Sequence, residues 1–317
     1  MTAGSRSVPE TEDEMKELIA SGESIESPEQ TTERYRELLT NYILIQVDNE
    51  LVTHYAYSKA WHTAPDQRAR LGVFSVLKDE MAHCHVSFRV LEGLGLSTEE
   101  LMYERDPSEF RNNFGIEFPA KNFAHMAVSI GLVDRAGGIV IEDMNQNCSY
   151  APYRRTLKRA VVDQRFHQKW GFTWMKRFVN HSPKAREAVQ EAVDFYFPAS
   201  LEWFGTPDDY SMPTEHFEYG IKARTSDEYR EQWLGEVVPF MEDIGIDVPA
   251  HTTESGDVEL DFDWPVAFDE EERTFRYDQP VGWDEVFDRW KRGGPIRDEL
   301  REELRHGGPQ ALAQAAD

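Results

Sequence analysis

Residues 77–83 most constrain how this chain can fold, because they place a carboxylate and an imidazole inside a segment with helical apolar spacing. Residues three positions apart lie on one face of a helix, so Glu80 and His83 point the same way. In helical bundles that bind two metal ions, two helices each contribute a Glu-x-x-His pair and two others each contribute a carboxylate. Glu80 and His83 would form half of such a site, and three further helices would have to complete it.

Three further segments have the apolar spacing and the end signals of long helices. We expect the four helices over residues 31–62, 67–94, 121–147 and 153–180. The fourth begins after Pro152, a residue that suits the first turn of a helix. Beyond them we expect helices over residues 184–204 and 226–245, short strands or extended chain over 246–281, and a last helix from Trp283.

The first and third helices each carry an acid among apolar neighbours. Glu50 lies in an apolar stretch, where an unpaired buried carboxylate is costly, so it is a candidate metal ligand. The alternative is a solvent-facing Glu50 beside the apolar stripe. Asp134 is a lone acid between apolar and small residues, and the apolar runs on both sides favour burial over a surface pair with Arg135.

The fourth helix offers His167 but not the expected glutamate before it. The residue three positions earlier is Gln164, and Asp163 stands four positions earlier on the same face. A neutral amide binds iron more weakly than a carboxylate, and Asp163 is shorter than Glu and displaced by one position. Either residue could complete the site, and the sequence does not choose between Gln164 and Asp163.

Several ordered motifs together resemble those of the catalytic A-type subunit of ring-1,2-phenylacetyl-CoA epoxidase, a bacterial multicomponent monooxygenase. The resemblance extends from about Tyr35 to about Leu304. The matching motifs are Asn49-Glu50-Leu51-Val52, Asp79-Glu80-x-x-His83, Leu132-Val133-Asp134, Ser149-Tyr150-x-Pro152-Tyr153, Phe166-His167-Gln168-x-x-Gly171, Phe197-Pro198-Ala199 and Phe204-Gly205-x-x-Asp208-Asp209. Such an ordered series is far more specific than a single Glu-x-x-His pair.

The resemblance implies an all-α fold, a ferritin-like four-helix bundle with additional C-terminal helices and a short extended or β segment. It implies an enzyme with a di-iron centre that uses O2 to epoxidise the ring of an aryl-CoA thioester, with phenylacetyl-CoA the first candidate. Electrons would come from NADPH through a separate iron-sulfur flavin reductase. Further partners would be a structural subunit of the same fold and a small accessory subunit. The ligands implied by matched position are Glu50, Glu80, His83, Asp134 and His167.

The chain departs from the family pattern at two places. Asp163-Gln164 stands where the family has Glu-Glu, and the stretch between Asp134 and Ser149 is one residue longer, which a bulge near Gly137-Gly138 could absorb. A non-catalytic structural paralogue of the same complex, with Gln164 weakening the metal site, is therefore the alternative. An iron-storage or radical protein of the same fold is disfavoured by the chain length and by the motifs.

A basic cluster opens the fourth helix. Coenzyme A carries phosphates, which helix N-termini and cationic side chains bind. We therefore expect this cluster to contact the phosphates, and the alternative is a solvated basic face that pairs with nearby acids. The cluster consists of Arg154, Arg155, Lys158 and Arg159.

The charge balance and the two cysteines bear on the partners of the protein and on its cellular compartment. A net charge of -25 disfavours nucleic acid and anionic membranes as partners. Two cysteines without a CxxC pair suit a reducing cytoplasm, and we expect neither a signal peptide nor a membrane span. We expect a flexible acidic segment over residues 1–28, one ferritin-like domain over 29–305 and a flexible tail over 306–317.

Overall fold

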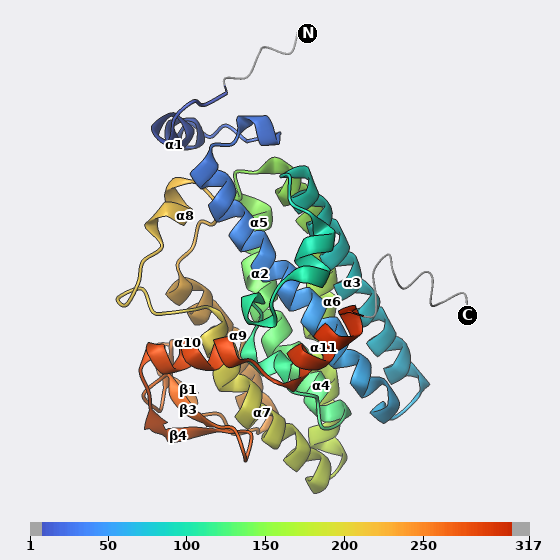
Figure 1. Cartoon of the computed structure of the whole chain (residues 1–317). Helices are drawn as coiled ribbons and strands as arrows, with labels where there is room; N and C mark the ends of the chain where they lie inside the picture. Colours follow the sequence, from blue (N-terminus) through green and yellow to red (C-terminus); the bar gives the residue numbers. More distant parts are fainter. Residues whose placement is uncertain (1–7, 306–317) are drawn as a thin grey trace, which may run out of the picture.

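The computed structural model describes residues 8–305, and most of them are helical (Figure 1). The ends of the four long helical segments agree with the sequence-based expectations to within a few residues. Asp66 caps the second segment by accepting a hydrogen bond from the backbone N–H of Ala69 at 2.8 Å. The four segments are α2 (Glu33–Ser58), α3 (Gln67–Gly93), α4–η6–α5 (Phe123–Asn147) and α6 (Ala151–His181).

The remaining elements pack around this bundle. Figure 1 shows α10 and the strands gathered at one end, beside α7 and α9, with α1 near the opposite end. The strands form two antiparallel pairs, β1 with β2 and β3 with β4. The expected all-α, ferritin-like bundle with additional C-terminal helices and a short β segment is therefore confirmed. The other helices are α1 (Glu12–Ala20), α7 (Pro183–Trp203), α8 (Thr214–Glu218), α9 (Ser226–Ile244), α10 (Trp283–Arg292) and α11 (Pro295–Arg305), and the strands are β1 (Ala250–Thr252), β2 (Val258–Leu260), β3 (Val266–Asp269) and β4 (Thr274–Pro280).

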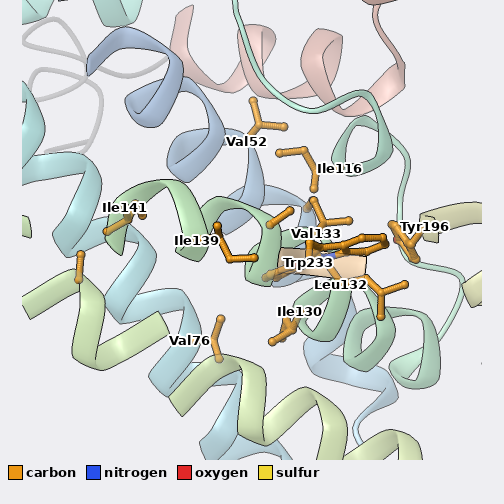
Figure 2. Close-up of a cluster of buried hydrophobic side chains, with 14 of the residues drawn as sticks. Val52, Val76, Ile116, Ile130, Leu132, Val133, Ile139, Ile141, Tyr196 and Trp233 are labelled. Carbon is orange, nitrogen blue, oxygen red and sulfur yellow. The ribbon is translucent and has the colours of Figure 1, made fainter. Parts of the chain in front are cut away.

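The segment α4–η6–α5 is the central helix of the core. Figure 2 shows its Ile130, Leu132 and Ile139 converging with Val76 of α3 and Trp233 of α9. The indole N–H of Trp233 donates to the backbone carbonyl of Leu132 at 2.9 Å, which satisfies the one polar atom of this buried ring. This segment is long and apolar enough to cross a membrane, but 83% of its most apolar window is buried inside the protein. Its apolar character is therefore accounted for by the core.

The central helix contains a π-helical turn, η6 (Ile130–Asp134). Bulges of this kind widen one turn of a helix and occur often at functional sites. The turn lies just before Gly137-Gly138, so the structure places the irregularity earlier than the sequence suggested. A Cβ added at Gly171 of α6 would lie 2.7 Å from the backbone N of Gly131, so only glycine permits this close helix approach. The contact brings Asp134, at the end of η6, against α6.

The N-terminal segment differs from the expectation of a flexible chain over residues 1–28. Residues 12–20 form α1, which a reciprocal capping box between Thr11 and Glu14 begins. Met15 and Ile25 are fully buried, and the backbone N–H of Ile25 donates to the carbonyl of Ser149 at 2.9 Å. These two apolar side chains anchor a segment whose overall composition is polar. Residues 1–7 and the expected tail over 306–317 lie outside the described residues.

Candidate metal centre

The structure brings the five ligands implied by matched position into one buried cluster. Glu50 comes from α2, Glu80 and His83 from α3, Asp134 from η6 and His167 from α6. They form two groups, Glu50 with Glu80 and His83, and Glu80 with Asp134 and His167. Within each group one ligand atom per residue lies within 4.8 Å of the others. Glu80 belongs to both groups, so its carboxylate stands between them.

Each imidazole directs its Nδ1 atom toward the carboxylates of the cluster. The Nδ1 of His83 lies 3.5 Å from Oε2 of Glu50. The Nδ1 of His167 lies 3.1 Å from Oε1 of Glu80 and 3.0 Å from Oδ2 of Asp134. Burying so many charged groups close together is costly unless their charges compensate one another or a bound cation neutralises the carboxylates.

The electrostatics of the cluster indicate an excess of negative charge. Burial, together with the nearby Glu50 and Asp134 carboxylates, raises the pKa of Glu80 well above its usual value. Burial opposes a charge on His167, but Asp134, Asp79 and Glu80 outweigh it and raise the pKa of that imidazole well above its usual value. Glu80 and His167 thus both favour their protonated forms in this buried space, whereas, despite burial, hydrogen bonds to Glu80 and Gln46 and the nearby His83 lower the pKa of Glu50. A divalent cation would replace the protons held by Glu80 and His167.

The donor atoms fit a pair of iron ions. Within the described residues, Oε2 of Glu50, Oε1 of Glu80, Nδ1 of His83 and Oε1 of Gln164 are buried and form no hydrogen bond. Buried polar atoms in proteins are normally satisfied, and a metal ion is one partner that would satisfy several such atoms gathered in one cluster. Carboxylate oxygens and imidazole nitrogens are donors that suit iron, and Glu80 is common to both groups of possible ligands.

The two doubtful residues of the fourth helix point in different directions. Oδ2 of Asp163 lies 3.3 Å from Nε2 of His83, on the side of the ring away from Glu50, and Asp163 also pairs with Arg159 at 2.7 Å. Gln164 instead lines the same small cavity as Glu50 and Glu80. Of the two candidates, Gln164 is the one that shares a cavity wall with Glu50, Glu80 and Asp134.

Sequence reasoning missed the role of Asp79. Its Oδ2 lies 3.5 Å from Nε2 of His167, so each imidazole has an aspartate from the facing helix behind it. Although burial opposes ionisation, contacts with His167 and Lys78 hold the pKa of Asp79 at about 2. The sequence carried a sign of this role, because the same spacing occurs twice. An aspartate stands four residues before each histidine, at Asp79 before His83 and at Asp163 before His167. Such partners orient a ligating imidazole and increase its basicity.

Two cavities meet beside this cluster. The inner cavity, of about 60 Å³, is lined by Glu50, Glu80, Asp134 and Gln164 together with apolar side chains. The outer cavity, of about 610 Å³, lies between the bundle and the C-terminal elements and is lined in part by α7 and α10. Their shared wall consists of four residues, Tyr42, Ile45, Val140 and Trp203.

The basic cluster of α6 lies at neither cavity. Arg154 donates to Ser24 at 3.0 Å, Arg155 pairs with Glu26 at 2.8 Å, and Arg159 pairs with Asp163. These contacts match the alternative of a basic face that pairs with nearby residues, and none of the four cluster residues lines the two cavities.

Lys222 is a cation at the outer cavity that the sequence did not single out. It is buried, and its Nζ lies 5.5 Å from the ring centroids of Phe217 and Tyr229. No ion pair to it is found in the part of the chain from residue 8 to residue 305. Burial lowers the pKa of Lys222 because it disfavours the charged amine, and an anionic ligand beside the amine would favour the charged form.

Comparison with known proteins identifies the family of this chain. Over 259 residues the chain is 26% identical to the A-type subunit of 1,2-phenylacetyl-CoA epoxidase from Escherichia coli (strain K12), a similarity that covers 80% of this chain and 84% of that protein. Residues 5–263 match the model of one family, the phenylacetic acid catabolic proteins. Because this match spans most of a chain that also carries the buried two-group cluster, the protein belongs to the phenylacetic acid catabolic protein family.

Proposed function

We propose that this protein is the di-iron subunit of a multicomponent monooxygenase that epoxidises the ring of an aryl-CoA thioester, with phenylacetyl-CoA as the first candidate. Membership of the family supports an oxidoreductase role in phenylacetic acid catabolism, and the similar Escherichia coli protein belongs to an epoxidase named for phenylacetyl-CoA. The observation that carries the proposal is the position of Glu80, shared by two ligand groups in the wall of a cavity.

The side chains of the cluster would each have a defined task. Glu50, Glu80, His83, Asp134 and His167 would hold two iron ions, with the Gln164 amide beside them, and the ions would supply the redox chemistry with O2. Asp163, which is hydrogen-bonded to His83, and Asp79, 3.5 Å from Nε2 of His167, would orient the two imidazoles from behind. The apolar core around η6 limits access of bulk water to the cluster.

The two cavities suit the two parts of an aryl-CoA thioester. The outer cavity has room for much of the pantetheine and nucleotide, and the inner cavity adjoins the metal ligands, where the ring would react. Lys222 is buried in the outer cavity without an ion pair among the described residues, which supports a contact with a CoA phosphate. Because the basic cluster of α6 lines neither cavity, we assign the phosphates to cations that line the outer cavity, Lys222 together with Arg111 and Lys291.

The proposed reaction needs partners. A reductase that takes electrons from NADPH, a structural subunit of the same fold and a small accessory subunit would complete the enzyme, and the cytoplasm provides NADPH and CoA thioesters. Exposed apolar side chains on two adjacent helices support the docking of another protein of the complex. These are Leu71, Phe74 and Met81 on α3 and Val162 and Phe166 on α6.

The first test is the iron content of the full-length chain, followed by O2 consumption with a reductase and aryl-CoA substrates. About two irons per chain and consumption that depends on the aryl-CoA would support the proposal. Iron near zero in well-folded protein would overturn it and would favour the non-catalytic paralogue, in which Gln164 has weakened the site.

A further inference from the structure

The wall between the two cavities contains one residue whose polar atom has no partner. Trp203 is the last residue of α7, which ends before Gly205, where φ is 85° and glycine is favoured. Trp203 lines both cavities. Within residues 8–305 its Nε1 is buried and forms no hydrogen bond. A buried N–H without an acceptor is costly, and at the wall of a cavity a ligand can supply that acceptor.

The other polar member of the wall is already held in place. Tyr42 packs against His216, with ring centroids 5.6 Å apart, and its hydroxyl interacts with Tyr229. Ile45 and Val140 have no polar side-chain atoms. Trp203 is therefore the member of the wall that is both bulky and unsatisfied.

The size of the inner cavity gives the wall a function. A protein cavity of about 150 Å³ accommodates a benzene ring. The inner cavity, at about 60 Å³, is smaller than this, so an aromatic ring can enter only if its wall yields. Trp203 has the largest side chain of the four residues that the two cavities share, so a movement of its ring would widen the passage between them most.

We propose that Trp203 determines which acyl groups reach the metal cluster: its ring sets the width of the passage, and its N–H donates a hydrogen bond to the thioester carbonyl oxygen. This inference rests on the proposed function, because the carbonyl lies at the wall only if the ring occupies the inner cavity and the CoA moiety the outer one. Trp203 acts here as a specificity-determining residue.

The test compares phenylacetyl-CoA with S-(2-phenylethyl)-CoA, a thioether in which a methylene replaces the carbonyl. Binding is measured by calorimetry on the anaerobic, iron-loaded, full-length chain without reductase, so that no turnover occurs. The wild-type protein should bind the thioester about two- to tenfold more tightly than the thioether, the range expected for one neutral hydrogen bond. In W203F, which keeps most of the bulk and loses the N–H, this ratio should fall to about one.

The matched control is W264F. Trp264 also has a buried Nε1 without a hydrogen bond among the described residues, but it lines neither cavity. Its replacement should leave the thioester-to-thioether ratio at the wild-type value. A second variant, W203L, widens the passage and should bind naphthylacetyl-CoA about five- to tenfold more tightly than the wild type does, because a second ring is buried. Circular dichroism verifies that each variant is folded.

The outcomes separate this inference from the proposed function. If the wild-type protein binds neither ligand, the proposed function fails and this inference fails with it. If the wild type binds aryl-CoA but W203F keeps the wild-type ratio, or W203L gains no affinity for the naphthyl ligand, Trp203 is not the specificity-determining residue and the proposed function stands. If W203F does not fold, the loss of the ratio in W203L provides the same test.

Discussion

His83 on α3 and Asp163 on α6 face each other across the bundle, with Nε2 of the imidazole 3.3 Å from Oδ2 of the carboxylate. Arg159 holds the same carboxylate from outside through a hydrogen bond of 2.8 Å. This chain of contacts fixes the ring so that its Nδ1 points toward Glu50. We therefore propose that Asp163 acts on the cluster through His83 and not as a ligand.

Replacing Asp163 by Asn should weaken metal binding without removing a ligand. The amide keeps the shape of the side chain but loses the charge that orients the imidazole and increases its basicity, so iron affinity should fall about 10- to 100-fold. Iron titration of the apo protein measures this change. Asp243→Asn is the control, because Asp243 forms an exposed pair with Lys176. Equal affinities in the two variants would contradict the assigned role of Asp163.

Replacing Glu80 should abolish iron binding at both ligand groups, whereas replacing Glu50 should abolish it at one. Because Glu80 is shared, Glu80→Ala should lower the iron content from about two per chain to near zero. Glu50→Ala leaves Glu80, Asp134 and His167 together and should retain about one iron. Both variants should keep the helical circular dichroism spectrum, since each removes a charge from a crowded buried cluster. Full iron occupancy in Glu80→Ala would show that the cluster is not the metal site.

Restoring a carboxylate at position 164 should strengthen metal binding. Gln164→Glu adds a negative charge at nearly constant volume, and the Cβ of Gln164 lies 3.3 Å from the position that a Cβ at Gly138 would take, so the site accepts little extra bulk. We expect iron affinity to rise about tenfold or more, because carboxylates bind iron better than amides. Gln164→Leu should lower it. Calorimetric iron titration distinguishes these outcomes, and unchanged affinity in both variants would place Gln164 outside the coordination sphere.

Protein stripped of metal by a chelator should lose stability as the pH rises. The pKa values of Glu80 and His167 are both raised above their usual values, so each group holds a proton in the folded state that it loses in the unfolded state. The two protonated groups contribute fully to the stability of the folded state below their usual pKa values. This contribution is lost as the pH rises through their pKa values in the folded state. The melting temperature of the stripped protein should therefore fall between about pH 6 and pH 9. This range begins near the usual pKa of histidine and extends above it. Iron-loaded protein should show a smaller fall, because the metal replaces these protons.

A buried ion pair joins α7 to the C-terminal elements. The guanidinium of Arg289 on α10 contacts the carboxylate of Glu202 on α7, and both side chains are almost completely buried. Arg289→Ala leaves the Glu202 charge buried without its partner and should cost about 3–5 kcal/mol of unfolding free energy. The double variant Arg289→Met with Glu202→Leu should be closer to wild type in denaturant titrations. A double variant as unstable as Arg289→Ala would show that lost packing dominates.

Much of the fold was accessible from local patterns. The four long helices and their ends follow from apolar spacing, Pro152, and breaks such as the one that ends in the Asp66 cap. Glu80 and His83 were identified by their separation alone, because three residues on one helix share a face. The N-terminal helix was missed because its polar composition concealed Met15, whose burial depends on contacts with distant segments.

The way in which the helices face one another could not be predicted from these local patterns. Asp163 and Gln164 are adjacent on one helix, yet Asp163 lies behind His83 while Gln164 lines the inner cavity, and the difference is set by the rotation of α6 against α3. The sequence also did not identify the partners of the α6 basic cluster or the position of Lys222 at the outer cavity. The contacts of a charged side chain depend on segments that meet only in the folded chain.

The amino-acid sequence thus specified the helices, the acids and imidazoles they carry and the family to which they belong, because spacing along one helix is a local property of about 3.6 residues per turn. Packing decided that Glu80 serves two ligand groups, that Asp79 and Asp163 stand behind the imidazoles and that Trp203 divides two cavities. These relations depend on the close approach and rotation of helices that are far apart in the chain, which spacing within one helix does not encode.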